Sequence, residues 1–189
     1  MKPLPFVWPY APLFWIAFVW AFWPEFAVIR KAKNSDVDRG SLQVIMIVNQ
    51  VAMLLAFAMP WTFRRARMPY VFFWIGIVLL IAGSVLRRHC FRVLGKFFTG
   101  SVQVQSDHAV VDQGAYRWVR HPSYTGGMMM FTGIGLALTN WVSFAVSALL
   151  PMLAYAYRVR VEERALAESI GEPYRAYMRT RKRFVPFVV

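Results

Sequence analysis

Residues 114–126, near the middle of the chain, combine cationic, aromatic and imidazole side chains directly before an apolar run. The residue that precedes a proline is disfavoured in the α region. Pro122 therefore predicts extended or turn geometry for Arg120 and His121, at a membrane surface and ahead of a new helix. Their side chains and backbone groups are then available to a ligand. The alternative is structural, because arginine and aromatic residues also gather at membrane boundaries as anchors.

A second polar group lies on the helix that we expect after the last apolar run. Arg158 and Glu162 are four residues apart and so share one helix face. An isolated pair of this kind is most often a surface ion pair worth less than ~1 kcal/mol. Together with the first group of polar residues, it favours a functional role. Glu163 lies ~100° around the helix from Glu162, which places it either behind a site or towards solvent.

The two groups together resemble the motifs of the isoprenylcysteine carboxyl methyltransferase family, which consists of integral-membrane enzymes that use S-adenosylmethionine. Residues 120–126 match the family motif RHPxYxG. The resemblance covers roughly residues 100–189. The second motif of the family is matched by Glu162, Glu163, Gly171, Tyr174, Tyr177 and Pro186.

This resemblance implies a binding site for S-adenosylmethionine and a second one for a lipophilic acceptor, such as a prenylcysteine carboxylate or a similar lipid-like group. Glu162 is implied in contacting the cofactor, as is an upstream glutamine, for which we choose Gln103 over Gln105. Arg158 is implied in binding the substrate carboxylate, so Arg158 and Glu162 form the catalytic pair. A carboxylate needs no general base, and positioning then supplies much of the rate. The other implied cofactor contacts are His108, Ala109, Val110, Val111, Tyr116, His121, Pro122, Ser123 and Tyr124.

The composition points to a membrane protein. Hydrophobic residues make up 58% of the chain and charged residues 16%, whereas a soluble domain has about half and a quarter. The net charge of +13 does not indicate nucleic acid, because the basic residues form short clusters between apolar runs and fit anionic lipid headgroups better. The single cysteine, Cys90, excludes an intrachain disulfide, and no Cys/His cluster has zinc spacing.

The apolar runs predict an all-α integral membrane protein of one domain with about five transmembrane helices. Runs 8–29, 42–63 and 70–86 are the first three expected spans. Runs 125–139 and 141–157 are short, and we interpret them as a tight helical hairpin in which small residues allow close approach.

The remaining segments are expected to form the cofactor site, from a cytoplasmic loop at 100–124 and a C-terminal helical cap at 158–189. Inside the spans, Asn49 is expected to bond to another helix, and Glu25 to reach the interface or pair with Arg30. Tyr174 and Tyr177 are expected to pack the tail against the membrane surface. The partner of Arg120 stays open between cofactor, substrate and lipid phosphate.

The basic residues predict the orientation. With five spans, one side of the membrane holds the 30–40 loop, the 87–124 region and the tail, which together carry 18 of the 22 Lys and Arg residues. Such an excess marks the cytoplasmic side. Both polar groups then face the compartment that contains S-adenosylmethionine, in a bacterial inner membrane or the endoplasmic reticulum.

Two other classes of protein remain as alternatives. An NADPH-dependent membrane reductase of the sterol type has a motif similar to RHPxY, but tends to have Asn before the Tyr and an acidic residue after the Gly. Ser123 and Gly127 stand at those positions here, which favours the methyltransferase. The third class is a non-enzymatic membrane component with anchoring Arg and Tyr residues. Binding of S-adenosylmethionine, of NADPH or of neither would separate the three.

Overall fold

The computed structural model describes residues 2–31, 40–95 and 110–184. Within these ranges the chain is helical, and its β-pairing is limited to two isolated bridges. This confirms the predicted all-α class. The elements are η1 (Leu4–Phe6), α1 (Tyr10–Lys31), α2 (Ser41–Thr62), α3 (Val71–Leu94), η4 (Gly114–Arg117), α4 (Pro122–Ala137), α5 (Trp141–Ser169) and α6 (Glu172–Thr180).

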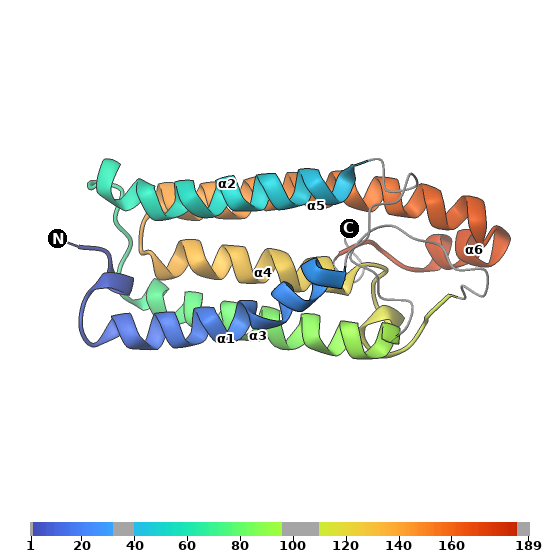
Figure 1. Cartoon of the computed structure of the whole chain (residues 1–189), viewed down its shortest axis with the longest axis horizontal. Coiled ribbons are helices and arrows are strands. Elements are labelled where there is room, and N and C mark those ends of the chain that lie inside the picture. The colour runs from blue at the N-terminus through green and yellow to red at the C-terminus, as the bar shows by residue number, and fades with distance from the viewer. Residues whose placement is uncertain (1, 32–39, 96–109, 185–189) are drawn as a thin grey trace.

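The five long helices run lengthwise along the molecule (Figure 1). In this view α1 and α3 lie on one side, α4 in the middle, and α2 and α5 on the other side. The main contacts agree, since α3 packs on α4, α2 packs on α5, and α4 also contacts α5. Within the described ranges, α2, α3 and α5 are long and apolar enough to cross a membrane. The chain is therefore an integral membrane protein, and the count of five spans stays a prediction.

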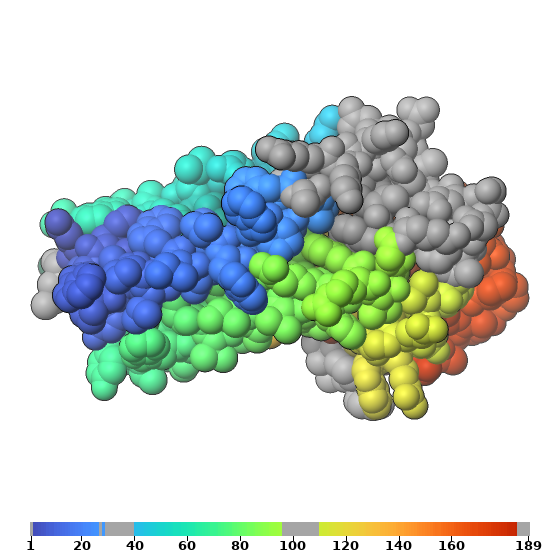
Figure 2. All heavy atoms as spheres, turned by 60° about the horizontal axis from the view of Figure 1, so that its bottom comes forward, coloured from blue at the N-terminus to red at the C-terminus, as the bar shows by residue number. Residues whose placement is uncertain are grey.

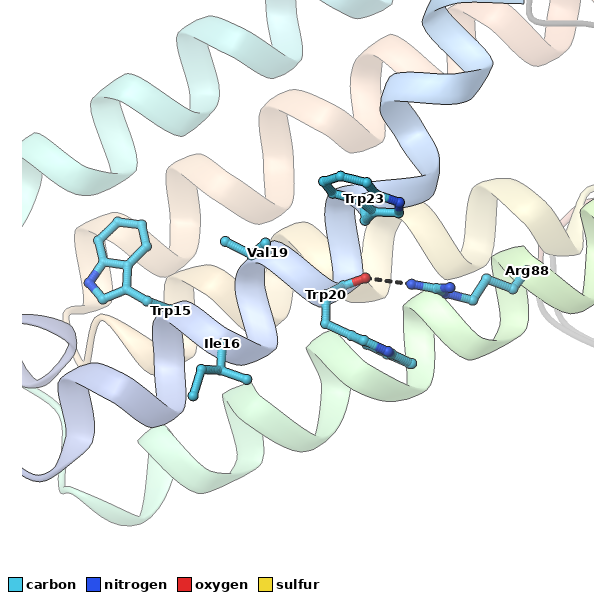
Figure 3. Close-up of a pocket in the computed structure, with 6 residues that line it drawn as sticks. All are labelled: Trp15, Ile16, Val19, Trp20, Trp23 and Arg88. Carbon is cyan, nitrogen blue, oxygen red and sulfur yellow. Dashed lines mark hydrogen bonds between the residues drawn. The ribbon is translucent and has the colours of Figure 1, made fainter.

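The outer surface of the bundle is strongly apolar. Ile16 of α1, Leu54 of α2 and Val78 of α3 are 70%, 62% and 65% exposed. Figure 2 shows the face of the bundle that α1 and α3 form. On α1 this face carries an open groove, drawn in Figure 3, and a surface of this kind suits contact with hydrocarbon. The groove is lined by Trp15, Ile16, Val19, Trp20, Trp23 and Arg88.

Glycines bring the backbones of α3 and α4 into direct contact. A Cβ atom on Gly76 would lie 2.5 Å from the carbonyl oxygen of Gly133 and 2.4 Å from the backbone nitrogen of Ala137. Seven residues further along α3, a Cβ on Gly83 would lie 2.5 Å from the carbonyl oxygen of Gly126. Small residues at the interface, which let two backbones approach closely, are typical of packed membrane helices. We call these four glycines the α3–α4 glycine seam.

A three-residue turn joins α4 to α5, which confirms the predicted tight hairpin. Asn140 caps α5, because its Oδ1 accepts hydrogen bonds from the backbone nitrogens of Val142 and Ser143 at 3.0 and 3.1 Å. Its Nδ2 donates to the carbonyl of Phe63 at 2.9 Å. A Cβ on Gly135 would lie 2.1 Å from Ser147 Oγ of α5, so this helix pair also approaches closely.

Two of the polar residues expected inside the spans have partners on other helices. Asn49 Nδ2 donates to the hydroxyl of Tyr155 at 3.4 Å, which confirms its predicted bond to another helix. Glu25 accepts from Arg87 of α3 with both carboxylate oxygens, at 2.7 and 2.6 Å. Glu25 thus has a partner on a different helix, whereas the side chain of Arg30 lies outside the described part of the chain, so the pairing with Arg30 stays a prediction.

The glycine seam predicts the effect of a single added side chain. Gly76→Val should lower the free energy of unfolding by about 1–3 kcal/mol, because the new atoms meet backbone that has no freedom to move aside. Thermal unfolding in detergent measures this change. The control is Val78→Ala on the exposed face of the same helix, which should leave the unfolding temperature close to that of the wild type. An equal shift of the unfolding temperature in both variants would contradict the inference that the backbone contact at Gly76 excludes a side chain.

Candidate functional site

The site lies where η4 leads into α4, at the end of the bundle where α5 extends beyond the other helices (Figure 1). Pro122 is the first residue of α4, and His121 precedes it with φ −127° and ψ 53°, outside the helical region. This confirms the geometry that the proline predicts. In Figure 2 the residues after 110, in yellow, lie beside the red C-terminal part of the chain.

The hydroxyl of Tyr124 joins the two polar groups of the sequence. It donates to Glu162 Oε2 at 2.7 Å and accepts from Arg158 Nε at 3.2 Å. A guanidinium, a phenol and a carboxylate are therefore connected in a row, from α4 to two successive turns of α5. The predicted catalytic pair, Arg158 and Glu162, thus meets the first motif at this hydroxyl.

Arg158 is deeply enclosed by the protein. The residue is 3% exposed. Its Nη1 donates to Ser41 Oγ at 2.6 Å, and Ser41, the first residue of α2, is itself fully buried. Sequence reasoning missed Ser41, whose available signal was its position after Gly40, at the start of an apolar helix.

Glu163 forms the centre of a second cluster, behind the first. Its Oε1 lies 3.1 Å from His121 Nε2 and 3.2 Å from Arg120 Nη2, and its Oε2 lies 2.9 Å from Arg183 Nη2. The Glu163 side chain is 4% exposed. Of the two expected placements, the one behind the site is therefore right and the solvent-facing one is wrong. Arg120 also donates to the carbonyl of Met178 at 2.9 Å.

The C-terminal segment runs alongside the first motif. The backbone nitrogens of Arg120 and His121 donate to the carbonyls of Lys182 and Arg183 at 2.8 and 2.9 Å, next to a parallel bridge between residues 119 and 182. Thr125 Oγ1 donates to the carbonyl of residue 184 at 2.9 Å. Glu163 and these backbone bonds together hold the tail against the RHP segment.

The two tyrosines of α6 pack inside the protein. Tyr177 donates its hydroxyl to the carbonyl of Tyr116 at 2.6 Å, and both Tyr174 and Tyr177 are buried. The prediction that they pack against the membrane surface was wrong. Burial raises the pKa of Tyr174 above its usual value, and the nearby carboxylates of Glu162 and Glu163 raise this pKa further. The ring of Tyr174 is thus a neutral neighbour of the glutamate pair.

The other predicted cofactor residues fall into two groups. Gln103, its alternative Gln105, and His108 and Ala109 lie outside the described residues. Val110 and Val111 are half-buried where the described chain resumes. Tyr116, Pro122 and Ser123 are buried. Burial, with the Cys90 thiol and Glu162 beside it, raises the pKa of Tyr116.

The site offers groups that suit a zwitterionic ligand with an aromatic base. Glu162 is an acceptor, and the buried Nε of Arg120 has no hydrogen-bond partner within the described part of the chain. The rings of His121 and Tyr124 stack with centroids 5.7 Å apart, and the ring of Phe184 lies 6.3 Å from that of His121. A carboxylate, a guanidinium and a set of neighbouring aromatic rings are therefore present within one small region.

This fold and site define a membrane-embedded helical bundle with its polar centre at one end. Residues 74–168 match the profile of the isoprenylcysteine carboxyl methyltransferase (ICMT) family, and the chain belongs to this family. The matched range contains the glycine seam, the first motif, Arg158 and both glutamates.

Individual relatives agree with this assignment. The chain is 31% identical over 115 residues to protein-S-isoprenylcysteine O-methyltransferase A of Arabidopsis thaliana, a match that covers 60% of this chain and 58% of that protein. It is 32% identical over 116 residues to protein-S-isoprenylcysteine O-methyltransferase of Tribolium castaneum, covering 60% and 41% of the two chains. The chain thus spans less than two thirds of the length of these relatives.

A solved structure is also similar. The match is to the eukaryotic intramembrane Ras methyltransferase ICMT, with a TM-score of 0.64 and 28% sequence identity. It covers 76% of this chain and 52% of that structure. The helical arrangement described above is therefore shared with an integral-membrane methyltransferase.

Removing the negative charge of Glu163 should loosen the contact between the C-terminal segment and the first motif. Glu163→Gln leaves two guanidinium groups without their carboxylate, and breaking a buried pair costs about 3–5 kcal/mol. Hydrogen exchange should therefore become faster at the amides of Arg120 and His121, which bond to the tail. Glu168→Gln, an exposed glutamate on the same helix, is the control and should leave exchange unchanged. Wild-type exchange rates in Glu163→Gln would contradict the anchoring role.

Proposed function

We propose that this protein transfers a methyl group from S-adenosylmethionine to the carboxylate of a prenylcysteine or a similar lipid-like acceptor. Family membership and the names of the relatives support the type of reaction. The observation that carries the proposal is the Tyr124 hydroxyl between Arg158 and Glu162. It brings a group suited to an anionic acceptor and a group suited to a cationic donor to adjacent positions.

The cofactor end of the site is built from both motifs. S-adenosylmethionine supplies an electrophilic methyl group on a sulfonium centre when bound. Glu162 would accept hydrogen bonds from its ammonium or ribose hydroxyls, and Arg120 Nε would donate to its carboxylate. The stacked rings of His121 and Tyr124 would form a wall for the adenine. The 103–111 segment and Tyr116 would complete the cofactor site, as the family resemblance implies.

Arg158 serves the acceptor in this proposal. A guanidinium holds a carboxylate through two parallel hydrogen bonds, and its own position is set by Ser41 and Tyr124. The acceptor carboxylate is already the nucleophile, so the residues around it orient and desolvate it without removing a proton. Holding both reactants in line supplies much of the rate acceleration.

The acceptor enters from the membrane in this proposal, and the cofactor enters from the cytoplasm. The apolar outer face of the bundle leaves the lipid tail of the acceptor in hydrocarbon while its headgroup reaches Arg158. The excess of Lys and Arg on the side of the motifs supports a cytoplasmic site. Arg87, which we counted with that side, is buried in the bundle, and the excess remains large without it. The host membrane would be a bacterial inner membrane or the endoplasmic reticulum.

The reductase alternative is disfavoured by packing around α4 as well as by the family match. In the reductase motif an acidic residue tends to follow the glycine, at the position of Gly127. A Cβ atom there would lie 2.6 Å from the Tyr155 hydroxyl and 3.2 Å from Arg87 Nη1. An acidic side chain at this position would therefore require the side chains of Tyr155 and Arg87 to move.

Direct assay tests the reaction. Purified protein should transfer labelled methyl from S-adenosylmethionine to a farnesylated cysteine derivative, and not to the same cysteine derivative without its prenyl chain. Binding of NADPH in place of S-adenosylmethionine would support the reductase, and binding of neither would support a non-enzymatic component.

Glu162→Gln should weaken cofactor binding. The substitution preserves shape but replaces the anionic acceptor, and a hydrogen bond to a charged group contributes about 1.5–3 kcal/mol. The dissociation constant for S-adenosylmethionine, measured by calorimetry in detergent, should rise roughly ten- to a hundredfold. Glu168→Gln removes the same charge from an exposed position of α5 and serves as the control. Equal affinities for S-adenosylmethionine in the two variants would show that Glu162 does not contribute to cofactor binding.

Arg158→Lys should separate substrate binding from cofactor binding. Lysine keeps the charge but lacks the planar fork that holds a carboxylate. We expect methyl transfer to fall roughly ten- to more than a hundredfold, while the affinity for S-adenosylmethionine stays within a few-fold. The matched control is Arg160→Lys, an exposed arginine two residues along the same helix. Full transfer activity in Arg158→Lys would show that Arg158 does not bind the acceptor carboxylate and has only a packing role.

A further inference from the structure

The bend in α1 is fixed by side chains from α3. Pro24 has no N–H, so the carbonyl of Trp20, four residues earlier, loses its helical donor. Arg88 of α3 donates to this carbonyl, and Ser84 Oγ donates to the adjacent carbonyl of Ala21 at 2.9 Å. Figure 3 shows Arg88 reaching Trp20 where α1 changes direction. The orientation of the residues that follow Trp20 is therefore set by α3.

The residue directly after Pro24 makes a two-pronged ion pair with α3. Arg87 donates through Nε and Nη2 to the two carboxylate oxygens of Glu25, at 2.7 and 2.6 Å. Their side chains are 10% and 21% exposed. A pair that is largely withdrawn from solvent adds little stability compared with apolar packing of the same volume. Its contribution is a defined geometry for the guanidinium.

The third nitrogen of Arg87 reaches the first motif. Nη1 donates to the carbonyl of Ser123 at 3.0 Å and lies 3.4 Å from Ser123 Oγ. Two glycines of α4 leave space for this side chain, because a Cβ on Gly126 would lie 2.8 Å from Arg87 Cγ, and one on Gly127 would lie 3.2 Å from Nη1. The guanidinium thus connects the bend of α1 to the first turn of α4.

We propose that Glu25 and Arg87 are positioning residues for the site. Glu25 orients the guanidinium, and the guanidinium fixes Ser123. The backbone of Ser123 then sets where the Tyr124 hydroxyl stands between Arg158 and Glu162. This inference rests on the proposed function of that hydroxyl, and it assigns to the buried ion pair a role in catalysis that acts through another residue.

The test compares Arg87→Met with the double variant Glu25→Leu/Arg87→Met. Arg87→Met leaves the Glu25 carboxylate buried and unpaired, so its unfolding temperature should fall, and the double variant should recover most of that loss because it removes both charges. Methyl transfer should not recover. We expect kcat at saturating substrates to stay roughly ten- to a hundredfold low in both variants, because Ser123 has lost its donor.

Asn140→Ala is the control for a purely structural effect. It removes the cap of α5 at the opposite end of that helix from Glu162, and should lower the unfolding temperature without changing kcat. Recovery of both stability and kcat in the double variant would overturn the proposal, since the pair would then contribute stability alone.

A second measurement does not depend on enzymatic activity. With 3-fluorotyrosine at position 124, the ¹⁹F resonance should shift or broaden in the double variant and keep its wild-type position in Asn140→Ala. A wild-type spectrum in the double variant would overturn the positioning role. If the wild-type protein transfers no methyl group, the proposed function is wrong, whereas the fluorine spectrum still decides whether the ion pair positions Tyr124.

Discussion

The absence of side chains along the α3–α4 glycine seam is the constraint on which the rest of this structure depends. Gly76 and Gly83 face Gly133 and Gly126, and the two backbones meet with no layer of side chains between them. Because α4 also packs against α5, it is the central element from which the positions of the other helices follow. The seam ends within two residues of Tyr124, so the first turn of α4 has little freedom to shift.

Two adjacent carboxylates serve different purposes because a helix turns ~100° per residue. Glu162 faces Tyr124, whereas Glu163 faces His121, Arg120 and the tail. In the proposed function Glu162 receives a ligand, whereas Glu163 neutralises cations at the end of the site. A change of register by one residue would exchange their environments, so the helical phase of α5 determines which carboxylate reaches the centre.

The sequence was sufficient where local patterns determine structure. Apolar runs predicted the long helices, Pro122 predicted the start of α4, and the spacing of Arg158 and Glu162 predicted their shared face. The sequence was insufficient where the rotation of one helix against another determines which residue a polar side chain contacts. Arg87 and Glu25 are 62 residues apart and each had a plausible local explanation, as a loop cation and an interfacial carboxylate. Ser41 and the burial of Tyr177 depend in the same way on tertiary contacts that a single sequence does not encode locally.

The unbroken course of α5 has a geometric consequence. Its 29 residues extend ~44 Å at 1.5 Å per residue, which exceeds the ~30 Å hydrocarbon thickness of a bilayer. Arg158 and Glu162 are separated along this rod by a rise of ~6 Å, without any loop between them. The helix therefore acts as a molecular ruler. In the proposed function, the depth at which Arg158 holds an acceptor and the height at which Glu162 holds a donor are coupled, and neither can be adjusted by loop motion alone.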